Sequence, residues 1–299
     1  MKYGAFTLSL LKAMVLKDIK KRRKYYPPKD EFRKWINIPY LDDDNKYHTY
    51  DVYLADESIR KHCLFIDIHG GAYIFGEHQD NYPYAYVMLK AGYDVALLDY
   101  EPNNGKKDIK DIVVDLANNF KHLVEHFSDY DLVKDQIVIT GDSAGGHLAL
   151  LFSVALQSQE VREKLGIELP DLKVIATVVA CPAYNFEVLG ESQLTNGARK
   201  RMLGPKFKDV EHLRVYSPRT YMDYHQAPIF LSTCKNDFVR SESMLLLEDL
   251  KDKHKYQFID IDSDKKEVDH VHNVVKINLE ESKQVNNAII AFIDNLLNK

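Results

Sequence analysis

The feature that most constrains the fold is the stretch IVITGDSAGGHL at residues 137–148. A short β-branched run enters the turn Gly-Asp-Ser-Ala-Gly at residues 141–145, and an apolar segment with helical spacing follows it. Such a junction is typical of a sharp strand–turn–helix connection that holds a serine hydroxyl free of the sheet, and glycines have no Cβ to collide where strand and helix close together. The pattern predicts that Ser143 is a nucleophile and not an incidental serine in a glycine-rich connection.

Composition narrows the class of protein. The 299 residues suffice for one large α/β domain or two small ones, and 45% hydrophobic with 28% charged residues is ordinary for a soluble globular protein. A net charge of −5 gives no field that would attract nucleic acid, so we expect no nucleic-acid partner. A small molecule is the expected partner, and the cytoplasm is the default location. Cys63, Cys181 and Cys234 are far apart in apolar runs, which predicts buried thiols and no disulfide framework or metal site.

The N-terminal segment is amphipathic. Residues 6–19 resemble the apolar core of a signal peptide, but charged residues interrupt the run and no small-x-small cleavage site follows it. The run is also too short to span a membrane. Apolar side chains repeat at helical spacing before a basic run at residues 20–24: Leu8, Leu11, Val15 and Ile19. Residues 1–28 are therefore expected to form a helix docked on its own domain, as a cap element, with contact to an anionic membrane as the less favoured alternative.

Further along the chain, short apolar runs alternate with amphipathic segments. An antiparallel hairpin is predicted at residues 35–41 and 48–54, and six more strands at 63–68, 93–99, 136–140, 174–180, 228–234 and 256–261. Helices are predicted at residues 82–90, 109–127, 144–157, 241–250 and 286–297. This alternation predicts a single three-layer α/β domain over residues 1–299, with a mostly parallel sheet, an antiparallel N-terminal hairpin and helices on both faces.

One segment interrupts this alternation. Residues 184–226 lie between two predicted strands and are too long for a plain connection, although they contain a short helical piece at 198–203. We interpret the segment as a cap insertion that would cover the mouth of the site together with the N-terminal helix. Several tyrosines could line an aromatic pocket there, with simple packing as the more ordinary role: Tyr73, Tyr184, Tyr216, Tyr221 and Tyr224.

A serine nucleophile needs a base that takes its proton and an acid that orients the base. Asp237 follows a predicted strand directly, where an ordinary helix-capping role is the alternative. The loop after the last predicted strand offers two candidate bases, His270 and His272. Asp142, inside the turn, is expected to be structural, with its side chain buried by hydrogen bonds.

A tetrahedral oxyanion also needs hydrogen-bond donors. The sequence His-Gly-Gly-Ala at residues 69–72 directly follows a predicted strand. A loop with few side chains allows backbone N–H groups to approach an oxyanion, and Ala144 supplies the N–H that follows the nucleophile.

Taken in chain order, these pieces resemble the α/β-hydrolase fold, specifically the esterase and lipase group related to hormone-sensitive lipase. The resemblance covers residue 60 onward and rests on residues 69–72, the turn at 141–146, Asp237 and His270, with Ser217-Pro218 also similar. It implies a serine hydrolase that cleaves small carboxylic esters without a cofactor or metal ion, through a triad and an oxyanion hole. The triad would be Ser143, His270 and Asp237, and the oxyanion-hole N–H groups would come from Gly71, Ala72 and Ala144.

The resemblance favours His270 over His272 as the base, because relatives often carry an aromatic residue at the place of His272. Two departures stand out: Ala72 replaces a third glycine, and Glu101 stands where relatives often have an arginine that forms a structural ion pair. An arylformamidase-like amidase with the same triad is the alternative, and a non-catalytic ligand-binding homologue is less favoured. The natural substrate, its acyl chain length and the oligomeric state do not follow from the sequence.

Overall fold

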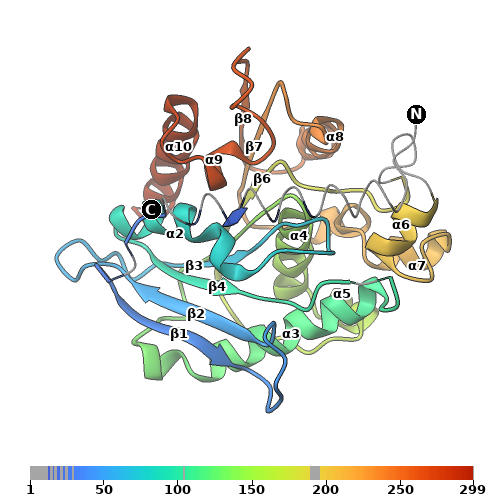
Figure 1. Cartoon of the computed structure of the whole chain (residues 1–299), viewed down its shortest axis with the longest axis horizontal. Coiled ribbons are helices and arrows are strands. Elements are labelled where there is room, and N and C mark those ends of the chain that lie inside the picture. The colour runs from blue at the N-terminus through green and yellow to red at the C-terminus, as the bar shows by residue number, and fades with distance from the viewer. Residues whose placement is uncertain are drawn as a thin grey trace.

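The computed structural model describes residues 13, 16, 19, 20, 23, 26–28, 30–103, 105–188 and 196–298. Its centre is an eight-stranded sheet with the strand order β1-β2-β4-β3-β5-β6-β7-β8 (Figure 1). The strands are β1 (Arg33–Pro39), β2 (Thr49–Leu54), β3 (Leu64–Ile68), β4 (Asp94–Leu98), β5 (Ile137–Asp142), β6 (Val174–Ala180), β7 (Ile229–Cys234) and β8 (Tyr256–Ile261). β2 pairs antiparallel with both β1 and β4, and every other pair is parallel, so the predicted mostly parallel sheet with an antiparallel hairpin is confirmed.

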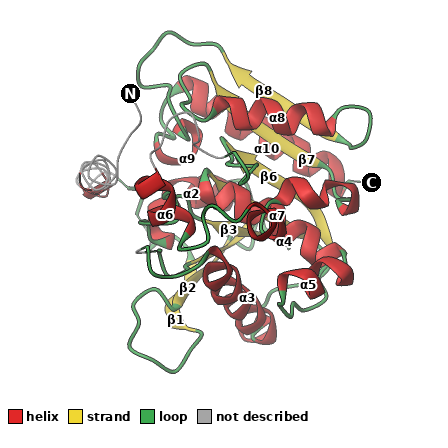
Figure 2. Cartoon of the chain, turned by 90° about the vertical axis from the view of Figure 1, so that its right-hand side faces the viewer, coloured by secondary structure: helices red, strands yellow, loops and turns green. Residues whose placement is uncertain are grey.

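Helices cover both faces of the sheet and complete three layers, and Figure 2 looks onto the helices of one face with the strands behind them. The larger core lies under α3 (Ile109–Glu125), α4 (Ala144–Gln157) and α8 (Arg240–Leu250). The smaller core lies under α2 (Tyr82–Lys90), α9 (His272–Val275) and α10 (Glu280–Leu297). The remaining helices are η2 (His78–Asn81), η3 (Phe127–Tyr130), α5 (Gln159–Leu165), α6 (Asn196–Leu203), α7 (Val210–Val215) and η4 (Pro218–Tyr224). None of the helices in the described ranges is long and apolar enough to cross a bilayer.

The sequence predicted most of these elements closely. β6, β8, α2 and α4 begin and end at the predicted residues. The prediction for α10 was wrong by six residues, because the polar turn at its start lacks apolar periodicity and yet carries Glu280 and Glu281, which favour a helix N-terminus. α5 was not predicted, although Ser158 caps its start and Gly166, with φ +67°, ends it.

The segment between β6 and β7 contains α6, α7 and η4, and it packs against α4 and the loop that precedes α3. Asn103 Nδ2 donates to the carbonyl of Met202 at 3.2 Å, and His212 Nε2 lies 2.5 Å from Asp108 Oδ1. The cap role of residues 184–226 stays a prediction.

Most of the predicted N-terminal helix lies outside the described residues. Of those described, Ile19 is buried, and Arg23 donates to Asp80 and Glu77. Both carboxylates follow the loop after β3 at residues 69–76, which we call the oxyanion loop after its predicted role. The predicted buried, unpaired cysteines are confirmed, because all three are free and buried.

Candidate active site

Ser143 lies at the junction of β5 and α4 with φ +53° and ψ −116°, a backbone conformation that non-glycine residues rarely adopt. Three backbone hydrogen bonds hold it there. Its N–H donates to Ala180 at 2.9 Å, and its carbonyl accepts from His147 at 3.1 Å and Ala183 at 3.0 Å. Strain of this kind persists only where the surroundings fix it, and Ser143 is half-buried at the carboxyl edge of the sheet.

The two glycines of the turn are required by close backbone packing. A Cβ on Gly145 would lie 1.9 Å from the carbonyl oxygen of Ile68, and a Cβ on Gly141 would lie 2.4 Å from the carbonyl oxygen of Gly145. The first turn of α4 therefore rests directly on the end of β3, which brings Ser143 next to the loop that follows β3.

Replacing Gly145 with alanine is accordingly expected to lower the free energy of unfolding by about 2–3 kcal/mol, because backbone atoms must move to admit the methyl group. Gly166→Ala is the matched control, since Gly166 also has a fixed role at a helix end but has open space around its Cβ position. Alanine at the left-handed φ of position 166 should lower the free energy of unfolding by about 1 kcal/mol. Urea unfolding of both variants measures the difference, and equal losses would contradict the packing argument.

Asp237 lies just after β7 with its side chain buried and fully hydrogen-bonded. Its Oδ1 accepts from the N–H of Val239 at 3.0 Å and lies 2.6 Å from Nδ1 of His270, while its Oδ2 accepts from the hydroxyl of Thr233 at 2.9 Å. Burial raises the pKa of Asp237, but the hydrogen bond and charge of His270 outweigh it and hold that pKa below its usual value. The carboxylate is therefore suited to orient the His270 ring.

The two candidate bases have different surroundings. His270 has a partly exposed side chain against the exposed ring of Phe238, whose centroid lies 4.3 Å from that of His270. His272 is buried instead, with Nδ1 2.8 Å from the hydroxyl of Ser282 on α10, and burial lowers its pKa. Only His270 of this pair contacts Asp237 through its ring.

The loops that carry the three predicted triad residues leave the sheet at one edge. β5, β6, β7 and β8 are consecutive parallel neighbours, so the loops that follow them leave from the same edge. His270 is close enough to Asp142 for its charge to lower the pKa of that carboxyl, which burial raises more strongly. Asp142 directly precedes Ser143, which places His270 near the serine turn.

The loop after β3 has an unusual backbone. Gly71, Ala72 and Tyr73 have φ values of +122°, +52° and +63°, and a Cβ on Gly71 would lie 1.9 Å from the carbonyl oxygen of Phe75. The N–H groups of Gly71 and Ala72 have no acceptor among the residues that the structure describes, and both residues are half-buried. Two adjacent free N–H groups beside the serine turn are suitable donors for an oxyanion.

Asp142 fixes this loop to the turn. Its Oδ1 accepts from the N–H of Gly70 at 2.9 Å and from Nδ2 of Asn81 at 2.8 Å, and its side chain is buried. Asn81 also donates to Asp67 at 2.8 Å, and burial next to the charge of Asp142 raises the pKa of Asp67 to about 8. Sequence reasoning expected a structural Asp142, but it missed Asn81, because no local pattern connects η2 to β5.

A buried ionic network contacts the start of the oxyanion loop through His69. His78 Nδ1 lies 2.6 Å from Asp99 Oδ2, and its Nε2 lies 3.1 Å from Asp51 Oδ1. His69 Nε2 lies 3.2 Å from Asp99, and its ring stacks on Tyr100. Burial lowers the pKa of His78, but the charge of Asp99 and the pairing with Asp51 outweigh it and raise that pKa to about 10. His78 is therefore a buried cation between two carboxylates.

A second serine–histidine pair lies in the core and is unsuited to catalysis. Ser153 Oγ lies 3.1 Å from His225 Nε2, and Thr177 shares the contact. All three side chains are at most 3% exposed, and burial lowers the pKa of His225 to about 3. No substrate can reach this pair, which ties α4 to β6 and to the segment before β7.

Most of the tyrosines that could have lined an aromatic pocket are packed in the interior. Four of the five are buried: Tyr73, Tyr184, Tyr216 and Tyr221. Tyr73 packs its ring edge-on against His147 and Phe186. Glu101 stands where relatives often have an arginine. Its carboxylate pairs with Lys107 and accepts a hydrogen bond from Nδ2 of Asn45 at 2.9 Å.

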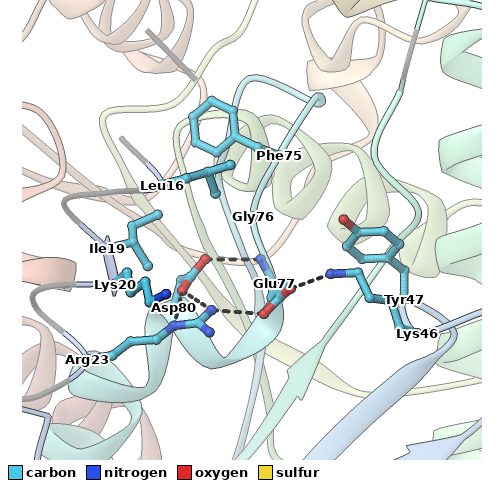
Figure 3. A pocket seen from close by; sticks show the side chains of 10 residues that line it. All are labelled: Leu16, Ile19, Lys20, Arg23, Lys46, Tyr47, Phe75, Gly76, Glu77 and Asp80. Atoms are coloured by element: carbon cyan, nitrogen blue, oxygen red, sulfur yellow. Dashed lines mark hydrogen bonds and ion pairs between the residues drawn. The ribbon is translucent and has the colours of Figure 1, made fainter. Parts of the chain in front are cut away.

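A pocket of about 320 Å³ opens beside the oxyanion loop (Figure 3). Leu16, Ile19 and Phe75 supply apolar side chains to its lining. Arg23 and Lys46 also line it, and both form ion pairs with Glu77. The predicted triad residues are not part of this lining, so the pocket is separate from the candidate triad.

Comparison with known proteins agrees with this architecture. The BD-FAE family model matches residues 50–250. The probable carboxylic ester hydrolase LipM of Mycobacterium tuberculosis is 26% identical over 179 residues, which is 58% of this chain and 41% of that protein. A probable isoprenylcysteine alpha-carbonyl methylesterase of Arabidopsis thaliana is 24% identical over 58% of this chain and 37% of its own length. The chain thus spans about two fifths of the length of these curated relatives.

Solved structures show the same fold. Esterase B from Lactobacillus rhamnosis superposes with a TM-score of 0.86 at 21% identity and covers 97% of this chain and 94% of its own. A hyperthermophilic esterase from Pyrobaculum calidifontis gives a TM-score of 0.72 at 18% identity, with 97% and 93% covered. The predicted α/β-hydrolase fold and the likeness to esterases of the hormone-sensitive-lipase type are therefore confirmed. Because the family model matches well over half of the chain, the protein belongs to the BD-FAE family.

Proposed function

We propose that this protein is a carboxylic ester hydrolase that cleaves small esters through an acyl-enzyme on Ser143. The observation that carries the proposal is the 2.6 Å contact between His270 Nδ1 and the buried Asp237 carboxylate, on the loops that neighbour a strained serine. A carboxylate on Nδ1 keeps the proton on that nitrogen and leaves Nε2 free to act as the base. The names of the curated relatives, both of them ester hydrolases, support the same reaction class.

The chemistry follows in two halves. Ser143 Oγ attacks the ester carbonyl while His270 Nε2 takes its proton, and the N–H groups of Gly71, Ala72 and Ala144 hold the negative oxygen of the tetrahedral intermediate. His270 then gives the proton to the departing alcohol, which leaves an acyl group on Ser143. Water, activated by the same imidazole, repeats the sequence and releases the acid.

A fluorophosphonate probe tests the nucleophile. We expect stoichiometric labelling of the full chain, with the adduct located on Ser143 by peptide mass spectrometry. Ser153→Ala is the matched control, because Ser153 also contacts a histidine but is completely buried. This control should label as the unaltered protein does. Failure of the unaltered protein to label would revive the non-catalytic, ligand-binding alternative.

A substrate panel separates ester from amide cleavage. Aryl esters of increasing acyl length and formylkynurenine would be compared by kcat/KM under one set of conditions. We expect the short-chain esters to be preferred, and a preference for formylkynurenine would replace the esterase proposal with the arylformamidase alternative. The same panel measures the acyl length that the protein accepts.

A further inference from the structure

A cluster of three metal-ligating groups lies inside the candidate site. The thiol of Cys181, a carboxylate oxygen of Asp237 and a ring nitrogen of His270 all lie within 4.8 Å of one another. Cys181 directly follows β6 with φ +48°, and its sulfur accepts a hydrogen bond from the N–H of Val271 at 3.5 Å. The thiol is thereby fixed against the loop that carries the histidine.

The chemistry of this cluster suits a borderline-soft divalent cation. Thiolate, imidazole and carboxylate are the ligands that Zn²⁺ prefers, at distances of about 2.0–2.3 Å. Ligand atoms around one tetrahedral zinc ion are separated by roughly 3–4 Å. The three atoms can converge on one ion when the contact between Asp237 and His270 opens slightly. A sulfur ligand selects zinc or cadmium over magnesium and calcium, which take oxygen ligands.

Charge and access also favour such an ion. A thiolate and a carboxylate together neutralise a divalent cation, so the buried site would carry no net charge from these groups. Cys181 and Asp237 are 2% and 6% exposed, whereas the His270 side chain is 16% exposed and forms the open side of the cluster. An ion would enter past the partly exposed ring of His270.

We propose that Cys181, Asp237 and His270 form an inhibitory site for Zn²⁺. The sequence predicted only a buried thiol at Cys181, because the cluster depends on loops after three different strands, β6, β7 and β8. Binding requires only the geometry of these three residues. Inhibition rests on the proposed function as well.

The protons balance without any redox step. The Cys181 thiol loses its proton to solvent as its sulfur binds the ion. The metal ion replaces the proton on Nδ1 of His270, and the neutral ring then carries its proton on Nε2. An N–H at Nε2 cannot accept a proton from Ser143, so the base is lost while zinc remains bound. Removal of the ion by a chelator restores the original tautomer and the activity.

Calorimetric titration of the metal-free full chain with Zn²⁺ tests the binding. Cys181→Ala removes one ligand, and Cys63→Ala is the matched control, since Cys63 is equally buried but lies just before β3, in the smaller core and outside the cluster. We expect one zinc ion per chain and a loss of affinity of at least about 100-fold in Cys181→Ala, with Cys63→Ala unchanged. Titration with Cd²⁺ should add a thiolate-to-metal absorption band that Cys181→Ala lacks.

Ester hydrolysis, expressed relative to the metal-free rate of each variant, tests the inhibition. Zinc should inhibit the unaltered protein and Cys63→Ala equally, and Cys181→Ala should need about 100-fold more zinc for the same effect. Equal zinc affinity in the two variants would overturn the site, and zinc binding without loss of hydrolysis would overturn its inhibitory role. A chain that binds zinc through Cys181 but hydrolyses no ester when metal-free would refute the proposed function and leave the binding site standing.

Discussion

Replacing Ser143 with alanine is expected to lower kcat/KM for p-nitrophenyl acetate by about 10⁴- to 10⁶-fold, because the acyl-enzyme can no longer form. That loss corresponds to about 5–8 kcal/mol of transition-state stabilisation. The side chain is small and half-exposed, so the melting temperature should change little. Steady-state kinetics and a thermal melt on the same preparation measure both quantities.

Two further variants sharpen this experiment. His270→Ala should cost about as much as Ser143→Ala, and the double variant should be no worse than either, because the residues act as one unit. Ser153→Ala should keep kcat/KM within about fivefold, since its hydroxyl lies in the core with Thr177 and His225. Full activity in Ser143→Ala would show that the nucleophile has been wrongly assigned.

His78→Gln is expected to lower the free energy of unfolding by about 3–5 kcal/mol, the usual cost of removing one partner from a buried ionic network. His78 is 3% exposed and lies between Asp99 and Asp51, which would remain buried without their cation. Glutamine keeps hydrogen-bonding ability and similar bulk, so the loss would report the charge. His62→Gln, at an exposed histidine, should change stability by less than about 0.5 kcal/mol.

The pH dependence of this loss has a definite sign. The pKa of His78 is raised from 6.5 to about 10 in the folded protein. Its stabilising contribution is therefore complete below the unfolded value of about 6.5 and disappears as the pH rises through about 10. Urea unfolding at several pH values should show the gap between the unaltered protein and His78→Gln narrowing across that window. A gap that is constant or widens would contradict a buried imidazolium.

Much of the fold could be predicted from local patterns, and the reason is visible in particular elements. The continuous apolar run of β6 and the apolar helical segment of α4 carry their own periodicity, and both have the predicted ends. The first turns of α10 have no such periodicity, because their buried face offers only one apolar side chain, Val285, beside the buried Ser282. Motif spacing likewise pointed to Asp237 and His270, since each lies in the segment that follows a predicted strand.

The residues that the sequence did not suggest are those whose role depends on distant partners. Asn81 acts through β3 and β5, and Thr233 through Asp237 four residues later. Phe238 and Cys181 surround His270 only because β6, β7 and β8 are neighbours in the sheet. No single-sequence pattern encodes such contacts, so motifs could point to the candidate triad but not to the residues around it.

The strand order has a consequence for how activity arises during folding. β3 and β5 pair at the centre of the sheet, and Ala180 and Ala183 hold Ser143, so the serine turn and the oxyanion loop can form once the chain has been synthesised as far as Ala183. The proposed base is synthesised much later, because His270 follows β8, the edge strand that pairs with β7. Long-range parallel pairing of this kind is slow. In a refolding experiment, hydrolysis should therefore appear after most of the helical signal has returned, and a nascent chain that ends before β8 would hold a nucleophile with no base to activate it.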